Sequence, residues 1–312
     1  MKTFVKDRFD EVIFPARLVP GDRIGIAAPA SPFESITFQQ GLEMIRQLGF
    51  EPVVPEGVFE ENGYLAGSDE HRADQLHRLF ADPSIQAIIC ARGGYGSLRL
   101  LASLDFGLIR SNPKVFVGFS DISTLLSAIT QQCGLVTFHG PMVTTLAGAG
   151  SQTRKSFVSA LSADDHMIVE PDRGVTLRAG SGTGPAAGGN LTTLCHLVGT
   201  PFQPVWRGHI LFIEDRGEAL YRVDRMLTQL KLAGCLDGLS GLMLGSFKDC
   251  GDIDGIYRLV MDLFDAEGLP IAAGFDIGHQ SPNCTLPLGV TATLDADRCV
   301  LTYHSAPTGG SP

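Results

Sequence analysis

A serine, a histidine and an acidic residue at the ends of predicted strands are the first candidates for chemistry in this sequence. Ser120 comes directly after the strand-like run 115–118 and directly before a helix-period segment. A serine in this position can be exposed on a sharp turn close to backbone amides, which suits a nucleophile. The segment GFSDI lacks the second glycine of the hydrolase motif GxSxG, however, and a serine before a helix is also an ordinary N-cap. A nucleophilic role therefore requires a base and a group that orients the base.

The histidines differ in how well their surroundings suit a catalytic base. His279 follows a predicted strand and lies in the loop GHQSPN, whose glycine and proline favour a defined backbone. His139, between Phe138 and the pair Gly140-Pro141, is a second candidate for lining a site. The others lie on a charged helix face, within an apolar helix pattern, or in polar segments without distinctive neighbours. We therefore favour His279 as the base.

Three acidic residues compete to orient this base. Glu214 follows the apolar run 210–213, so it should lie at a strand end, where burial and a histidine partner are both available. Asp215 is its neighbour, and Glu218 follows four residues after Glu214. Spacing alone does not separate the three, and Glu214 could instead cap or bridge the helix that follows.

A glycine-rich loop, RGGYG at 92–96, follows the predicted strand 87–90. Ligands of open parallel sheets bind at the carboxyl ends of strands, and glycine lets the backbone approach a ligand closely. The same loop could be a tight turn without a ligand. It could also cradle a phosphate at a helix N-terminus, as in a nucleotide- or sugar-binding module. Against such a module, the chain has no Gly-Lys-Ser or Gly-Lys-Thr sequence, and the acid and histidine would have no role in it.

The elements that must position these residues alternate along the first half of the chain. Short β-branched runs alternate with helix-period segments, which predicts a parallel sheet covered by helices. Between about 146 and 188 the pattern gives way to Gly, Ser, Thr and scattered charges, as in an inter-domain region. We expect a nucleophile domain at 1–150, a linker region at 151–185, and a domain carrying acid and base at 186–312.

The composition narrows the classes of function. The net charge of −10 gives no field that attracts phosphate backbones, so nucleic acid is not an expected partner. The 44% of hydrophobic residues and 19% of charged residues are typical of a soluble globular protein. The segments 122–153 and 179–206 contain no Asp, Glu, Lys or Arg, but their polar residues and glycines argue against membrane spans. We expect these two charge-free segments to form the packed support of an inter-domain site.

The N-terminal residues and the cysteines point to the cytoplasm. The first 14 residues mix both charge signs and lack the apolar core of a secretory signal. The seven cysteines include no CxxC pair, which disfavours a disulfide framework and a structural zinc site. We therefore expect no metal.

Five motifs in order along the chain resemble those of the LD-carboxypeptidases, and the likeness runs from about Pro20 to about Tyr303. They are ARGGYG at 91–96, GFSD at 118–121, GGNL at 188–191, FIED at 212–215, and GH at 278–279 with NCTLPLG at 283–289. The resemblance implies an α/β fold, with an N-terminal parallel-sheet Rossmann-like domain and a smaller β-rich α/β C-terminal domain. It also implies a homodimer with no cofactor.

The resemblance further implies a serine peptidase with Ser120 as nucleophile, His279 as general base and Glu214 as the residue that orients it. The amides of Asp121 and Gly94 would form the oxyanion hole. The implied activity is removal of the terminal D-alanine from cytoplasmic muropeptide tetrapeptides in peptidoglycan recycling. A related branch of the family hydrolyses microcin C-type aminoacyl-nucleotides and uses the same triad, so that activity stays open.

Further residues are expected to bind the substrate. They are Arg92, whose cation would meet the substrate carboxylate, Gly93 in the same loop, and His139.

Overall fold

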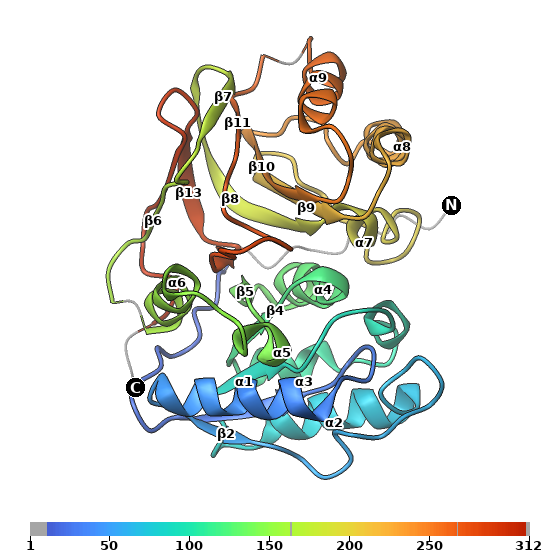
Figure 1. Ribbon diagram of the computed structural model, residues 1–312, viewed down its shortest axis with the longest axis vertical. Helices are drawn as coiled ribbons and strands as arrows, with labels where there is room; N and C mark the ends of the chain where they lie inside the picture. Colours follow the sequence, from blue (N-terminus) through green and yellow to red (C-terminus); the bar gives the residue numbers. More distant parts are fainter. Residues whose placement is uncertain (1–10, 163, 267, 310–312) are drawn as a thin grey trace.

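The computed structural model describes residues 11–162, 164–266 and 268–309. Two β-sheets, each with its own helices, form two halves of the molecule that lie one above the other in Figure 1. The first half of the chain builds the lower part, and most of the second half builds the upper part. The α/β fold class expected from the motifs is confirmed.

The N-terminal sheet has six strands, of which five are parallel. In spatial order they are β12 (Leu286–Leu288), β5 (Thr137–His139), β4 (Val115–Gly118), β3 (Ala87–Cys90), β1 (Arg23–Ala27) and β2 (Glu51–Val53). Only β12 runs antiparallel to its neighbour. The α-helices of this half are α1 (Ser35–Gln47), α2 (Asp69–Ala81), α3 (Phe106–Ser111), α4 (Ser123–Cys133), α5 (Val143–Leu146) and α6 (Ser151–Ser162).

Local sequence accounts for these elements. All residues of β3 and β4 are buried, as expected for parallel strands covered on both faces, and both strands have the bounds predicted from the sequence. The sequence predicts one apolar helix face from the spacing of Phe38, Leu42, Ile45 and Leu48; the first three are buried in α1, and Leu48 is its half-buried C-cap residue. The helix ends just before Gly49, whose φ of +96° lies in the left-handed region. By its sequence the segment 97–104, directly after the glycine-rich loop, could be helical, but the structure has only a short 3₁₀ turn there, η1 (Ser97–Leu100).

The C-terminal sheet has eight strands of mixed direction. In spatial order they are β6 (Ile168–Val169), β14 (Val300–Tyr303), β13 (Thr291–Asp295), β8 (Ser181–Asn190), β9 (Ile210–Arg216), β10 (Gly241–Lys248), β11 (Ile271–Ala273) and β7 (Val175–Arg178). The four strands from β8 to β11 are parallel. The helices of this half are α7 (Leu191–Cys195), α8 (Leu220–Leu232) and α9 (Ile253–Leu263).

The segment expected to be a linker contains regular structure. Residues 151–185 form α6, β6, β7 and the start of β8, and the three strands join the C-terminal sheet. The sequence of β8 is rich in glycine and therefore does not indicate a strand. The close packing of β8 against its neighbours nevertheless requires these glycines. A Cβ on Gly182 would lie 1.8 Å from the Ser240 carbonyl oxygen, and one on Gly188 would lie 1.9 Å from that of Phe212. The domain boundaries themselves stay a prediction.

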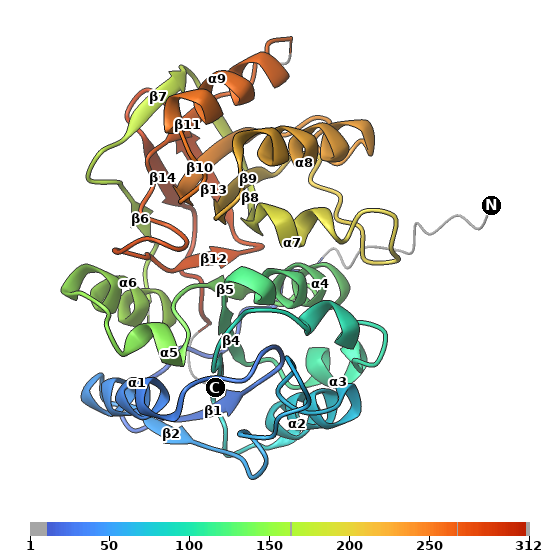
Figure 2. The same ribbon diagram turned by 45° about the vertical axis from the view of Figure 1, so that its right-hand side comes forward.

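The two halves are joined by a strand and by the charge-free segments. Strand β12 comes from the second half of the chain but pairs with β5 of the N-terminal sheet, between the two halves in Figure 2. The segment 122–153 contributes α4, and the segment 179–206 contributes β8 and α7. They meet where the amide of Asn190 donates to Ser123 Oγ at 3.0 Å. A Cβ on Gly189 would lie 2.5 Å from the same oxygen, so this contact requires glycine.

Candidate active site

Ser120 sits in a strained turn at the carboxyl end of β4. It begins a 3₁₀ turn, η2 (Ser120–Ile122), which leads into α4. Its φ of +62° lies in the left-handed region, which costs a non-glycine residue about 1–2 kcal/mol. The Ser120 carbonyl accepts a hydrogen bond from Thr193 Oγ1 at 3.3 Å, so the other half of the molecule helps to hold this conformation. Such strain at a strand-to-helix turn is typical of a serine nucleophile.

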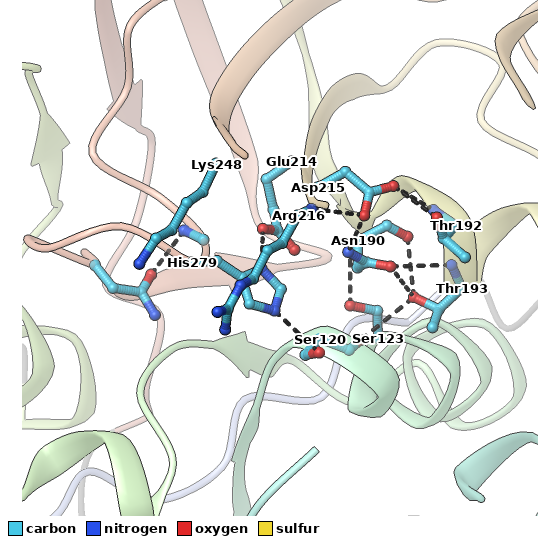
Figure 3. A network of polar contacts seen from close by, with 12 residues as sticks. Ser120, Ser123, Asn190, Thr192, Thr193, Glu214, Asp215, Arg216, Lys248 and His279 are labelled. Atoms are coloured by element: carbon cyan, nitrogen blue, oxygen red, sulfur yellow. Dashed lines mark hydrogen bonds and ion pairs between the residues drawn. The ribbon is translucent and has the colours of Figure 1, made fainter. Parts of the chain in front are cut away.

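His279 connects Ser120 to Glu214. Its Nε2 lies 3.1 Å from Ser120 Oγ, and its Nδ1 lies 2.6 Å from Glu214 Oε2 (Figure 3). With the proton on Nδ1, the ring donates to the carboxylate, and Nε2 is left to accept the serine proton. The three side chains come from β4–η2, from the loop after β11 and from β9, so they meet only in the folded chain. This arrangement has the order nucleophile, base and orienting acid of a catalytic triad.

Glu214 is held in the interior. Its side chain is 0% exposed, whereas that of His279 is 13% exposed. Burial raises the pKa of Glu214, and the hydrogen bond and charge of His279 oppose that shift. The close approach also requires a glycine, because a Cβ on Gly278 would lie 2.3 Å from Glu214 Oε2. An ionised Glu214 is therefore best stabilised when His279 is positively charged, as during proton transfer.

The structure places the three competing acids differently. Glu214 contacts His279, whereas Asp215 accepts hydrogen bonds from Asn190 Nδ2 at 2.9 Å and from the amide and hydroxyl of Thr192 at 2.9 and 2.8 Å. Glu218, two residues before α8 begins, has a carboxylate oxygen 3.4 Å from the guanidinium of Arg222 on that helix. Asp215 thus ties β9 to the start of α7, and Glu218 makes a surface ion pair.

The glycine-rich loop leaves space beside the serine oxygen. A Cβ on Gly93 would lie 3.2 Å from Ser120 Oγ and 3.4 Å from the Asp121 amide nitrogen. Because glycine has no side chain, this space is open next to both the attacking oxygen and a backbone donor. Gly94 has a φ of +106°, and Ser31 Oγ accepts from the next amide, that of Tyr95, at 3.1 Å. The expected oxyanion donors Asp121 and Gly94 therefore lie on two loops that meet at Ser120.

Two buried groups fix those loops. The Asp121 carboxylate accepts from the Ser97 amide at 2.9 Å, which ties η2 to the end of the glycine loop, and burial raises the pKa of this carboxyl. The fully buried Arg72 guanidinium donates to the Pro29 and Gly96 carbonyls and pairs with Asp69. Sequence reasoning missed Arg72, since charge on a helix is usually solvated.

His139 does not line the site, which corrects the sequence interpretation. It belongs to β5 rather than to a loop, and it is 0% exposed. Its ring packs against Phe119 and Phe212, with centroid distances of 5.8 and 4.9 Å, and Phe119 in turn packs on His279 at 5.0 Å. Burial, with a smaller effect of His279, lowers its pKa to about 3. His139 is therefore a neutral side chain behind the site.

Arg92 also lies elsewhere than expected. Its guanidinium donates to the Pro32 carbonyl at 2.8 Å. A cavity of about 480 Å³ opens beside His279, and Arg216 rather than Arg92 lines it. Arg216 follows Glu214 by two residues on β9, a spacing that places both side chains on one face of the strand. That spacing is the signal in the sequence that could have identified Arg216.

Across residues 11–162, 164–266 and 268–309, no group of three His, Cys, Asp or Glu is arranged to hold a metal ion. No helix in these ranges has the length and apolar character needed to cross a membrane.

Comparisons with known proteins point to one family. The model of the LD-carboxypeptidase N-terminal domain matches residues 24–140, and that of the C-terminal domain matches residues 183–294. A Streptomyces coelicolor protein provisionally named a carboxypeptidase is 40% identical, over 94% of this chain and 96% of its own. A "Probable murein peptide carboxypeptidase" of Bacillus subtilis is 38% identical, over 90% of this chain and 91% of its own. The microcin C7 self-immunity protein MccF of Escherichia coli is 31% identical, over 91% of this chain and 94% of its own.

Solved structures from the same two groups share the fold. An MccF-like protein from Bacillus anthracis superposes with a TM-score of 0.90 at 27% identity, covering 94% of this chain and all of its own. The muramoyltetrapeptide carboxypeptidase of Oxalobacter formigenes gives a TM-score of 0.81 at 31% identity, covering 92% of this chain and all of its own. Both family domains match in order, over residues 24–140 and 183–294, and show that the protein belongs to the LD-carboxypeptidase family and is a serine carboxypeptidase.

Proposed function

We propose that this enzyme removes the terminal D-alanine from muropeptide tetrapeptides by hydrolysing an L,D peptide bond. The observation that carries the proposal is the chain of contacts from Ser120 through His279 to Glu214, with distances of 3.1 and 2.6 Å. The murein peptide carboxypeptidase of Bacillus subtilis, which is similar over most of its length, supports this choice of substrate. On the resemblance alone, we place the reaction in the cytoplasm, in peptidoglycan recycling, and expect a homodimer without a cofactor.

The geometry suits a two-step acyl transfer. In the first step Ser120 Oγ attacks the scissile carbonyl while His279 Nε2 takes the hydroxyl proton. The C–N bond then breaks, and His279 returns the proton to the amine of the departing D-alanine, leaving an ester on Ser120. In the second step His279 deprotonates a water molecule that attacks the ester, and Ser120 regains its proton. Glu214 holds the ring and stabilises its positively charged form in both steps.

Backbone amides make the second contribution to catalysis. The carbonyl oxygen becomes negatively charged in each tetrahedral intermediate, and we assign its stabilisation to the amides of Asp121 and Gly94. Removing one such donor in a comparable site costs on the order of 10²- to 10³-fold in kcat. Gly93 leaves this space open, because any side chain there would approach Ser120 Oγ.

A second candidate function is hydrolysis of microcin C-type aminoacyl-nucleotides. It is favoured by the TM-score of 0.90 to the MccF-like protein, which exceeds the value of 0.81 to the muramoyltetrapeptide carboxypeptidase. Sequence identity points the other way, with 38% to the murein peptide carboxypeptidase and 31% to MccF. Because the same triad would catalyse both reactions, only the preferred substrate distinguishes the two functions.

Parallel assays on the purified enzyme separate the two functions. One measures amino-acid release from a muropeptide tetrapeptide ending in D-alanine, with the L-alanine epimer as the matched control. The other measures hydrolysis of aspartyl sulfamoyl adenosine, a compound bound by MccF in a solved complex. We expect rapid release of D-alanine, little release of L-alanine and slow hydrolysis of the nucleotide. Faster hydrolysis of the nucleotide than of the tetrapeptide would contradict the muropeptide function and support hydrolysis of aminoacyl-nucleotides.

A further inference from the structure

A carboxypeptidase must recognise the free carboxylate of the last residue in its substrate. That carboxylate carbon is separated from the attacked carbonyl carbon by three bonds, so the two atoms lie at most about 4 Å apart. The group that binds the carboxylate must therefore share the cavity with the triad. We propose that Arg216 binds the terminal carboxylate of the substrate and thereby restricts the enzyme to the last peptide bond. This inference rests on the peptide substrate proposed above.

Strand β9 places Arg216 at the triad. Arg216 is the last residue of β9 and lies two residues after Glu214. Successive side chains alternate between the faces of a strand, so Glu214 and Arg216 project from the same face. In Figure 3 both side chains extend toward the His279 side of the strand, and Arg216 lines the 480 Å³ cavity together with Phe119 and His279. One strand end thus supplies the acid of the triad and a cation in the same cavity.

Arg216 provides the charge of this cavity. It is the sole Lys, Arg, Asp or Glu among the lining residues that the structure describes. One wall comes from residues 141–153, within the first charge-free segment, and another from the loop 278–283. Because no carboxylate lines the cavity, the guanidinium meets no acid there. The cavity therefore favours binding of the anionic end of a peptide over binding of a cation such as a side-chain amine.

The guanidinium is available for a ligand. Its Nε lies 3.8 Å from Asp249 Oδ2, and both side chains are more than half exposed, at 57% and 63%. A solvent-exposed pair at this distance is weak and screened. Within the described part of the chain the Arg216 guanidinium donates no hydrogen bond; the residue's own amide donates to Asp215. The planar fork can therefore form two parallel hydrogen bonds to a carboxylate.

The other cations near the site are less suitable. The Arg92 guanidinium is directed to the Pro32 carbonyl. Lys248 lies opposite Arg216 in the register of β10 and β9, but it is absent from the described lining of the cavity. Its ammonium is also a point charge that lacks the fork geometry of a guanidinium. Lys248 therefore offers a matched control, since Lys248→Gln removes one positive charge from the adjacent strand position.

The test compares two substrates that differ only at the terminal group. One is the tetrapeptide ending in D-alanine, and the other is the same peptide ending in D-alaninamide, which has no terminal charge. We expect the wild type to prefer the free acid, and Arg216→Gln to lose about 10- to 100-fold in kcat/KM on the acid. The same variant should change the amide reaction by less than about threefold. Arg216→Lys should fall between these values on the acid, and Lys248→Gln should keep the wild-type preference.

The outcomes separate the inference from the function on which it rests. Because Arg216 is largely exposed, its variants should unfold at the wild-type denaturant concentration, and this is checked first. If the wild type releases D-alanine and Arg216→Gln keeps the acid-over-amide preference, the inference is wrong and the proposed function stands. A wild type that hydrolyses neither peptide contradicts the proposed function, and the carboxylate assignment with it.

Discussion

His139 makes stability depend on pH in a way that can be calculated. Its ring is fully buried, and neither ring nitrogen has a hydrogen-bond partner among the described residues. Burial lowers its pKa from an ordinary value of 6.5 to about 3, and His279 adds a smaller effect. Between these values the unfolded chain binds a proton that the folded chain does not bind. Stability from this residue is thus complete above pH 6.5 and is lost as the pH falls toward 3.

The magnitude follows from the two pKa values. At pH 4.5 protonation of His139 stabilises the unfolded state by RT ln(1 + 10²) and the folded state by almost nothing. The contribution of His139 to wild-type stability therefore falls by about 2.7 kcal/mol relative to pH 7.5. This figure changes little for any folded pKa below 4, since pH 4.5 is then still above it. The loss is large against a typical total stability of roughly 5–15 kcal/mol.

The perturbation is His139→Leu, which keeps an apolar side chain of similar size between Phe119 and Phe212. Urea unfolding at pH 7.5 and pH 4.5, for wild type and variant, gives four free energies of unfolding. Their double difference cancels the effect of the substitution on packing and should be about 2.7 kcal/mol. His196→Gln, at an exposed histidine, is the matched control and should keep the wild-type pH dependence. A double difference below about 1 kcal/mol would refute the reasoning.

Three further substitutions, and Glu218→Gln as a control, test the site. Glu214→Gln should lower kcat on the order of 10²- to 10⁴-fold, whereas Glu218→Gln should leave it unchanged. Because burial raises the pKa of Glu214, the free energy of unfolding of the wild type should fall relative to that of Glu214→Gln as the pH rises above 4.5. Urea unfolding of both proteins at pH 4 and pH 7 measures this difference. Gly93→Ala, whose methyl would lie 3.2 Å from Ser120 Oγ, should reduce kcat about 10²-fold with little change in unfolding; normal turnover would show that the space is not used. Arg72→Met leaves two buried carbonyls without their donor and should cost about 2–4 kcal/mol in urea unfolding, and an unchanged midpoint would contradict a structural role.

Much of the site could be predicted because its residues carry local signals. Strands β3 and β4 are apolar runs that end at polar or glycine residues, so their bounds and the position of Ser120 could be predicted. Glu214 lies within β9, two residues before its end, and His279 lies in the loop after β11, close to the strand ends expected for them. The choice among Glu214, Asp215 and Glu218 could not be made from spacing, because it depends on how β9 approaches the loop after β11.

The misses have physical causes that lie outside the local sequence. Strand β8 reads as a loop because its glycines make room for neighbouring carbonyls that the local sequence does not show. Strand β12 joins the N-terminal sheet from a position about 150 residues further along the chain than β5, a pairing that no periodicity indicates. The sequence points to Arg92 because it adjoins the glycine loop, and it gives no direct sign of Arg216, because the cavity that Arg216 lines is bounded by segments distant in sequence. The charge-free segments meet at Ser123 and Asn190, but 179–206 also contains exposed residues such as His196, so their role as packed support of an inter-domain site stays a prediction.

The central claim is that Ser120 is the nucleophile of a hydrolase that releases D-alanine from an L,D-linked tetrapeptide. Ser120→Ala tests it most directly, with D-alanine release measured beside the wild type and with urea unfolding as the control for folding. The account predicts a loss of at least about 10³-fold in kcat without a change in the unfolding midpoint. D-alanine release by a folded Ser120→Ala enzyme within about tenfold of the wild-type rate would contradict it.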